Sequence, residues 1–196
     1  GTGKTSLVGS FAVLAGRSVL ADCDVDAADL HLLMSPVVRR RETFTAGRLA
    51  VIDSARCTGC GLCEPLCRFG AIARELDGAP VAGAAERRAI FRVDPVACEG
   101  CGVCVDRCPE RAIDFPERTS GVWFVSQTRC GPMVHARLGI AAENSGKLVS
   151  LVRREARSIA ESDGIDTVLV DGPPGIGCPV IASLTGATAM LAVTEP

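Results

Sequence analysis

Cys57-Thr-Gly-Cys60-Gly-Leu-Cys63-Glu-Pro-Leu-Cys67 is the first of two similar cysteine runs in the sequence, and Cys98-Glu-Gly-Cys101-Gly-Val-Cys104-Val-Asp-Arg-Cys108-Pro109 is the second. Together the two runs hold eight of the 11 cysteines. Two-residue gaps allow three consecutive thiolates to surround one face of a small cluster, while the fourth cysteine, three residues further on, reaches away to the other half. The spacing therefore predicts [4Fe–4S] clusters.

Two other uses of cysteine fit the pattern less well. A structural zinc site would use isolated Cys-x2-Cys pairs with four ligands and would leave surplus thiols here. Disulfides require a geometry that cysteines three apart on a tight loop seldom reach, and nothing in the sequence suggests secretion. We therefore expect reduced thiolates and a cytoplasmic protein.

The two cysteine runs are also the halves of an internal repeat. A displacement of 41 positions places Asp53 on Asp94, and Ala71-Ile72 on Ala112-Ile113. Each half is a cysteine loop followed by a short apolar segment, so one structural unit is expected twice.

The repeat resembles the bacterial two-cluster ferredoxin over residues 49–116. That resemblance implies two [4Fe–4S] clusters, each with three cysteines from one run and the fourth from the other. The implied ligands are Cys57, Cys60, Cys63 and Cys108 for the first cluster, and Cys98, Cys101, Cys104 and Cys67 for the second. Arg68 stands where the second run has Pro109, so the local turn is the one place where the halves are expected to differ.

The chain begins with Gly1-Thr2-Gly3-Lys4-Thr5-Ser6, the second half of a phosphate-binding loop. In such a loop glycine N–H groups surround phosphates, the lysine reaches the β/γ-phosphates and a hydroxyl binds Mg²⁺. A strand should precede the loop, so we expect the chain to be a fragment. Leu7, Phe11 and Leu14 follow at helical spacing, and Gly16 is expected to end that helix.

Acidic residues follow two short apolar segments that are expected to be strands. Residues 18–21 lead into Asp22-Cys-Asp24-Val-Asp26, and residues 167–170 lead into Asp171-Gly-Pro-Pro-Gly175. The carboxyl ends of parallel strands face bound nucleotides, and acids there hold Mg²⁺ or orient the attacking water. The alternative for the first group is a polar loop that caps a helix beginning near Ala27.

The remaining pattern is that of an α/β protein. Strands are expected at residues 121–126 and, fully buried, at 189–193; a helix is expected at 144–160, ended by Gly164. Pro179 suits the first turn of another helix.

Taken together, G-T-G-K-T-S, D-C-D-V-D and V-D-G-P-P-G resemble the MinD/ParA class of P-loop ATPases, which includes the nitrogenase iron protein and the Mrp cluster carriers. More closely, the chain resembles MinD-superfamily ATPases with an inserted ferredoxin domain, and this extends to Gly131-Pro-Met-Val-His-Ala136 and Glu143-Asn-Ser-Gly-Lys147. The resemblance implies a mostly parallel P-loop (SIMIBI-type) sheet with helices on both faces, formed by residues 1–48 and 117–196. An α+β ferredoxin domain, residues 49–116, would interrupt it.

The same resemblance assigns roles around ATP and Mg²⁺. Asp24 would orient the water, Asp22 and Asp171 would serve the Mg²⁺ shell, and Gly175 would be the switch glycine. Phosphate contacts would come from the residues of the loop: Gly1, Thr2, Gly3, Lys4 and Ser6, with Thr5 as the Mg²⁺ ligand. The family also implies an upstream signature lysine and a homodimer that forms through the nucleotide face.

Composition limits the partners. The net charge is −2, with 47% hydrophobic and 22% charged residues, which gives no basic footprint for nucleic acid, and the arginine run 39–41 is expected to be a solvated loop. No apolar run is long enough to span a bilayer. Five side chains outside the motifs are expected to be structural: Cys23, Cys130, Cys178, His31 and His135. In the nitrogenase iron protein, a cysteine placed like Cys178 shares a cluster across the dimer.

Three functions remain open on the sequence. The first is an ATPase whose nucleotide state is coupled to electron transfer or to iron–sulfur cluster transfer, with a redox partner or a cluster-accepting protein. The second is a plain ferredoxin-type electron carrier on a degenerate P-loop scaffold. The third is a redox-sensing, MinD-like positioning switch.

Overall fold

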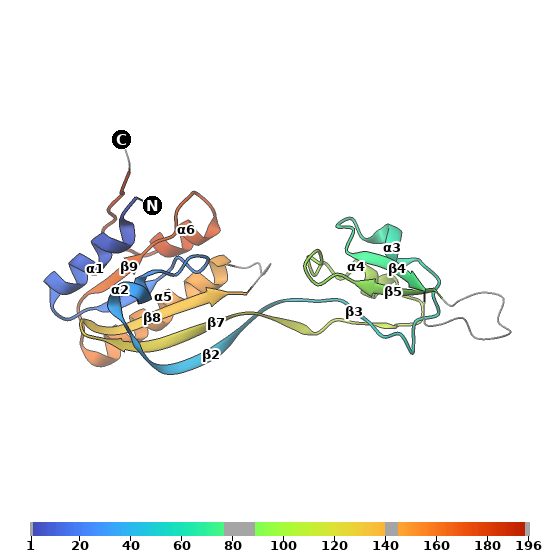
Figure 1. Ribbon diagram of the computed structural model, residues 1–196, viewed down its shortest axis with the longest axis horizontal. Coiled ribbons are helices and arrows are strands. Elements are labelled where there is room, and N and C mark those ends of the chain that lie inside the picture. Colours follow the sequence, from blue (N-terminus) through green and yellow to red (C-terminus); the bar gives the residue numbers. More distant parts are fainter. Residues whose placement is uncertain (1, 77–88, 140–144, 195–196) are drawn as a thin grey trace. The chain divides into compact units, whose positions relative to one another are not determined.

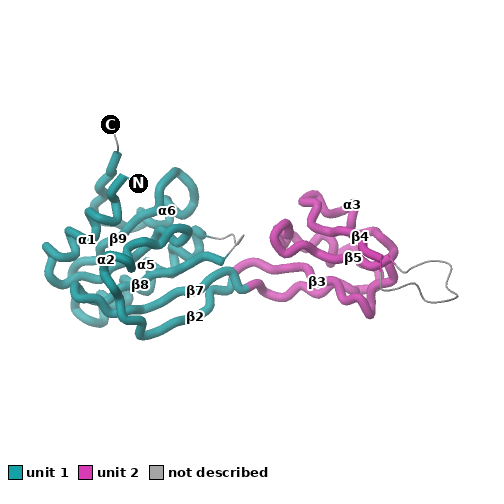
Figure 2. The backbone as a smooth tube through the Cα atoms, viewed as in Figure 1, with its two compact units in different colours: residues 1–45, 119–196 teal, residues 46–118 magenta. Residues whose placement is uncertain are grey.

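The computed structural model describes residues 2–76, 89–139 and 145–194. The chain forms two compact units, shown in Figure 2. Unit 1 consists of Gly1–Thr45 and Thr119–Pro196, and unit 2 consists of Ala46–Arg118. Unit 2 is thus an insertion within unit 1, and its borders lie within three residues of the expected range 49–116.

Unit 1 contains a five-stranded sheet with helices packed on it (Figure 1). The strands, in spatial order, are β2 (Val37–Arg48), β7 (Glu117–Thr128), β8 (Gly131–Leu138), β1 (Val19–Asp22) and β9 (Val168–Asp171). Strand β1 runs parallel to both β8 and β9, whereas β7 is antiparallel to β8. The protein is therefore α/β as predicted, but its sheet is mixed where a mostly parallel sheet was expected.

The mixed sheet follows from the tight connection between β7 and β8. Only two residues separate these strands, and so short a turn can join only antiparallel neighbours. Gly131 begins β8 with φ +129, and a Cβ there would overlap the backbone carbonyl of Ser18. A glycine is therefore required where the hairpin passes the start of β1.

The helices of unit 1 are α1 (Lys4–Ala15), α2 (Leu30–Met34), α5 (Ser145–Asp163) and α6 (Cys178–Leu184). They confirm the helices expected after Thr2, before Gly164 and around Pro179, although the expected start of α5 at residue 144 lies outside the described residues. Helix α5 packs against β8, β1 and β9 through buried residues: Leu148, Val149, Val152, Ala156 and Ala160.

Helix α1 has a different buried face from the one expected. Leu7, Phe11 and Leu14 are 38%, 43% and 80% exposed, whereas Ala12 is fully buried and Val8 packs beside it. Because α1 is apolar around most of its circumference, helical spacing alone cannot select the contact face. The small face is chosen, and it packs into a core formed with other buried residues: Leu20, Leu30, Met34, Cys130 and Met133.

The buried strand expected at residues 189–193 is wrong. These residues form no strand, and Met190 and Leu191 are 66% and 65% exposed. The segment pairs with no described strand, although β9 is the last in the sheet order among the described residues and has a free edge. Its apolar side chains are therefore exposed, although its composition is that of a strand.

The described residues of unit 2, 46–76 and 89–118, form two small antiparallel sheets and two short helices. Strands β3 (Val51–Ile52) and β6 (Ile113–Asp114) form one sheet, and β4 (Ile72–Leu76) and β5 (Ala89–Val93) form the other. Helix α3 (Cys63–Leu66) lies in the first cysteine run, and α4 (Val103–Arg107) lies in the second. Each sheet joins the strand before one cysteine run to the strand after the other.

The internal repeat is visible in the hydrogen bonds that close each cysteine loop. The amide of Asp53 donates to the carbonyl of Ala112 at 2.8 Å, and the amide of Asp94 donates to that of Ala71 at 2.7 Å. At the border of the unit the amide of Leu49 donates to the carbonyl of Pro116 at 3.1 Å, so the entering and leaving chains lie side by side.

Candidate metal centre

Two pockets in unit 2 each bring four cysteines together. One pocket is lined by Cys57, Cys60 and Cys63 from the first run and by Cys108 from the second. Ile52, Phe91, Pro109 and Ile113 supply part of its apolar wall. We call this pocket the first cysteine pocket.

The second cysteine pocket takes its cysteines from the two runs in the opposite proportion. It is lined by Cys98, Cys101 and Cys104 from the second run and by Cys67 from the first. Ala50, Phe69, Ile72, Val93 and Phe115 line it as well. These two sets of four are the ones that the ferredoxin resemblance implied, and the crossed fourth cysteine follows from the crossed strand pairing of the two sheets.

The fourth cysteine of each pocket receives a backbone hydrogen bond. The amide of Ala112 donates to Sγ of Cys108, and the amide of Ala71 donates to Sγ of Cys67, both at 3.3 Å. An N–H directed at sulfur favours its charged form. The turns match despite the difference between Arg68 and Pro109, because the Arg68 side chain lies outward over the Phe69 ring, 4.9 Å from its centroid.

Glycines bring the cysteine loops close to the aromatic walls. Gly61 and Gly102 have φ +76 and +77, a region that side chains avoid. A Cβ on Gly61 would lie 3.4 Å from Cζ of Phe91, and one on Gly102 would lie 3.2 Å from Cε1 of Phe115. At Gly102 a Cβ would crowd the ring, and at both positions the positive φ favours glycine.

The pocket walls disfavour free thiolates. Burial raises the pKa of Cys63 to about 11 and raises the pKa of Cys104, with neighbouring cysteines adding to both shifts. A cationic centre reverses this preference, because metal binding requires deprotonated sulfur and releases the protons. Cys60 and Cys101 are exposed, so each pocket opens to solvent at one ligand.

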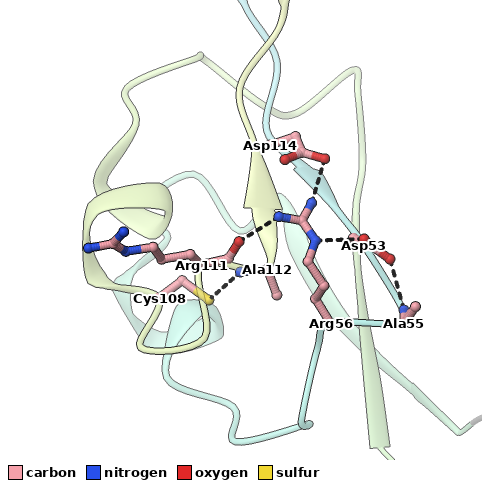
Figure 3. Close-up of polar contacts among 7 residues, drawn as sticks. All are labelled: Asp53, Ala55, Arg56, Cys108, Arg111, Ala112 and Asp114. Atoms are coloured by element: carbon pink, nitrogen blue, oxygen red, sulfur yellow. Dashed lines mark hydrogen bonds and ion pairs between the residues drawn. The ribbon is translucent and has the colours of Figure 1, made fainter.

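Sequence reasoning missed a bracket beside the first cysteine pocket (Figure 3). Arg56 joins Asp53 and Asp114 by ion pairs at 2.6 Å each. These contacts raise the pKa of Arg56 and lower that of Asp53, in each case chiefly through the side-chain hydrogen bonds. The repeat offered a signal, because its halves differ at these positions. Arg56 and Asp114 are charged, whereas their counterparts, Ala97 and Ala73, are not.

Unit 1 gathers the expected acidic residues at one end of the sheet. Asp22 and Asp171 are register partners on β1 and β9, and they are fully buried and 2% exposed. Oδ2 of Asp22 and both carboxylate oxygens of Asp171 have no hydrogen-bond partner among the residues that the structure describes. Burial, with the charge of Asp171, raises the pKa of Asp22 to about 8, and burial also raises the pKa of Asp171 and Asp24.

The expected phosphate loop lies next to these acids. The positive charge of Lys4 lowers the pKa of both Asp24 and Asp171, in partial opposition to burial. The Thr5 side chain also approaches Asp171 closely enough to lower its pKa, although no hydrogen bond of normal geometry joins them. Gly3 has φ +80 and Ser6 is exposed, whereas Gly1 lies outside the described residues. Gly175 has φ +96 with open space where a Cβ would lie.

The cysteines and histidines outside the motifs are mostly structural, as expected. Cys23 and Cys130 are buried, and burial raises the pKa of Cys23 to about 12. Cys178 is exposed, contrary to the expected burial, because it begins α6 at the surface. His135 is buried in a stack between His31 and Phe124 and shares a hydrogen bond with Ser126 at 2.9 Å.

The fold and pockets of unit 2 define an iron–sulfur module of the two-cluster ferredoxin type. In agreement, residues 56–113 match the family model of the 4Fe-4S dicluster domain. That match covers all eight pocket cysteines and, of the bracket, Arg56 and Arg111.

Along its whole length the chain is similar to uncharacterized protein MJ0578 of Methanocaldococcus jannaschii, with 30% identity over 200 residues. The alignment covers 100% of this chain and 64% of that protein, so the chain spans less than two thirds of its relative. Within the described ranges, no helix combines the length and the apolar composition required to cross a membrane.

Proposed function

We propose that the protein transfers electrons through two [4Fe–4S] clusters in unit 2. The observation that carries this proposal is the sorting of the eight cysteines into two pockets of four. The first cluster would be held by Cys57, Cys60, Cys63 and Cys108, and the second by Cys67, Cys98, Cys101 and Cys104. A cluster bound there accepts and returns single electrons at a potential set by its surroundings.

The protein's own residues would control those surroundings. Phe91 and Phe115 exclude water from the inner wall of each pocket. The amides of Ala71 and Ala112 direct N–H groups at cysteine sulfur. Hydrogen bonds to sulfur and solvent exposure are two of the means by which a protein sets cluster potential.

We further propose that unit 1 binds and hydrolyses MgATP. Supporting this, three buried carboxylate oxygens of Asp22 and Asp171 lack partners, and Lys4 and Thr5 lie beside them. Buried charge without a partner is costly, so such oxygens suit a divalent cation. Thr5, Asp22 and Asp171 would serve Mg²⁺, Lys4 would bind the β/γ-phosphates, and Asp24 would orient the attacking water.

A row of side chains would link this site to the strand that enters unit 2. Asp22 is the register partner of His135, and the His135 ring stacks on Phe124 with centroids 4.8 Å apart. The guanidinium of Arg41 lies over the Phe124 ring at 5.9 Å from its centroid. Since β2 carries Arg41 and continues to Arg48, we propose that a shift at Asp22 is passed along this row to the chain that leads into unit 2.

Delivery of a cluster to another protein is the second candidate. It is favoured by the exposure of Cys60 and Cys101, because each pocket then offers one ligand to an incoming thiolate. A redox protein or a cluster acceptor would be the partner in the two cases, and a homodimer through the nucleotide face is expected in both.

Anaerobically prepared full-length protein tests the proposal. About eight irons per chain are expected, four for each cluster, with an EPR signal on reduction. Stoichiometric zinc without an iron signal would refute it. Calorimetry with MgATP tests unit 1, with Lys4→Ala as the variant expected to lose affinity; absence of binding by the unaltered protein would leave a plain electron carrier.

Coupling is tested separately by midpoint potentials. They are compared without nucleotide, with MgADP and with a non-hydrolysable ATP analogue, in unaltered protein and in Phe124→Ala. Equal potentials in all nucleotide states would refute coupling, and a nucleotide effect that survives in Phe124→Ala would refute the row as its route.

A further inference from the structure

The bracket beside the first cysteine pocket uses the whole guanidinium of Arg56. Nε donates to Oδ2 of Asp53 and Nη2 donates to Oδ2 of Asp114, both at 2.6 Å, while Nη1 donates to the carbonyl of Arg111 at 2.8 Å (Figure 3). A planar donor fork that reaches three fixed acceptors holds them in one arrangement.

The bracket joins the two chain segments that supply the first pocket. Asp53 and Arg56 lead into Cys57, whose own amide donates to the carbonyl of Asp53 at 2.9 Å. Arg111 and Asp114 follow Cys108, and the amide of Arg111 donates to the carbonyl of Cys108 at 3.2 Å. One side chain therefore ties three cysteines of the first run to the fourth cysteine from the second.

The contact between Arg56 and the carbonyl of Arg111 affects Sγ of Cys108 through a single peptide group. The carbonyl of Arg111 and the amide of Ala112 belong to the same peptide group. Its oxygen accepts from Arg56, and its N–H donates to Sγ of Cys108 at 3.3 Å. A charged donor on the oxygen polarises the peptide, which strengthens the hydrogen bond made by its N–H.

The second pocket has the same peptide, but none of the described residues forms such a bracket beside it. The amide of Ala71 donates to Sγ of Cys67 at the same 3.3 Å, and Asp94 binds the amide of Val96 as Asp53 binds that of Ala55. However, alanine occupies the two positions that correspond to Arg56 and Asp114, namely Ala97 and Ala73. Neither alanine side chain can donate or accept a hydrogen bond.

We propose that Arg56 is a positioning residue that makes the two clusters unequal. It strengthens the N–H to sulfur bond at Cys108 and fixes the separation of the two segments, so the first cluster has the higher reduction potential and is held more firmly. This inference rests on the proposed function, since it requires both pockets to hold [4Fe–4S] clusters.

The decisive variant is Arg56→Ala/Asp114→Ala, which gives the first pocket the residues of the second and leaves the net charge unchanged. Potentials of both clusters are measured by EPR-monitored redox titration, and retention is measured as iron release to a chelator. We expect the higher potential to fall towards the lower one, the lower one to stay constant, and half of the iron to leave several-fold faster. Glu75→Ala/Arg92→Ala removes another exposed ion pair of unit 2 without changing the charge and is expected to alter neither readout.

Arg56→Lys is the second variant, because it keeps the charge but cannot make all three contacts. Its higher potential is expected to lie between those of the unaltered protein and the double alanine variant. If the double variant holds only four irons, Arg56→Lys decides the question. Two potentials that stay unchanged, or that move together, in variants with about eight irons would overturn the inference. Absence of clusters from the unaltered protein would instead refute the proposed function.

Discussion

The buried carboxylate of Asp22 in unit 1 predicts a stability that falls with rising pH. In protein free of Mg²⁺ and nucleotide, burial and the charge of Asp171 raise the pKa of Asp22 from 3.8 to about 8. The folded protein therefore keeps a proton that the unfolded chain releases above about pH 4. In this range the folded state binds more protons than the unfolded state. The free energy of unfolding therefore decreases as the pH rises from about 4 to 8 and levels off above that range.

Replacement of Asp22 by asparagine should remove this dependence. Each pKa unit corresponds to about 1.4 kcal/mol, so a shift of this size predicts that Asp22→Asn is more stable by on the order of 5 kcal/mol at pH 8.5 and by almost nothing near pH 4. Mg²⁺ with nucleotide should stabilise the unaltered protein at pH 8.5, because there both Asp22 and Asp171 offer anionic oxygens, and should stabilise Asp22→Asn much less.

Urea unfolding followed by tryptophan fluorescence measures the effect in unit 1. Trp123 is the one tryptophan of the chain, lies on β7 and is 6% exposed, so it reports on this unit alone. Asp26→Asn is the matched control, because Asp26 is an exposed carboxylate of the same loop. If unaltered protein and Asp22→Asn have parallel pH profiles between pH 5 and 8, the account of Asp22 is wrong.

Three further outcomes are expected. Leu148→Ala, at a fully buried position of α5, should destabilise unit 1 by about 3 kcal/mol in the same urea assay. Gly102→Ala combines φ +77 with a Cβ 3.2 Å from the Phe115 ring, so the second pocket should lose its cluster and the iron content should halve. Ala73→Asp/Ala97→Arg builds the missing bracket at the second pocket, and the lower of the two reduction potentials should rise towards the higher.

Each of these outcomes has a control or a contrary result. Leu191→Ala, at a 65% exposed position, should change stability by less than about 0.5 kcal/mol. Gly70→Ala, in the same unit, shares a positive φ, +63, but has open space around it, so unit 2 should keep all of its iron. If Gly102→Ala keeps all of its iron, the Phe115 ring moves to accommodate the added methyl group. If the lower reduction potential is unchanged in Ala73→Asp/Ala97→Arg, the bracket cannot be rebuilt at the second pocket.

The cysteine pockets could be anticipated because their pattern is local. Three of the four cysteines in each pocket lie within seven residues of one another, and the repeat itself indicates where the fourth returns. The strands that end at Asp22 and Asp171 were equally accessible, since three consecutive apolar residues that lead into an acid are typical of a short buried strand.

What the sequence could not supply depends on contacts between distant segments. Phe11 and Leu14 have a helical spacing, but the face of α1 that is buried depends on the size of the groove beside it, and Ala12 fits. Residues 189–193 have the composition of a strand but pair with no strand of the described part of the chain. Arg56 reads as an ordinary surface charge until Asp114, 58 positions away, is placed beside it by the pairing of β3 with β6.

The pairing of β3 with β6 also allows unit 2 to be inserted as a whole into another domain. Val51 and Asp114 are register partners, and the bond between Leu49 and Pro116 keeps the two chain ends together just outside them. A host domain can therefore accept the whole segment in a single loop without being spread apart, because the points of entry and exit are neighbours. Neither half could be inserted alone, because each pocket takes its fourth cysteine from the other half. The smallest segment with two complete pockets therefore begins before β3 and ends after β6.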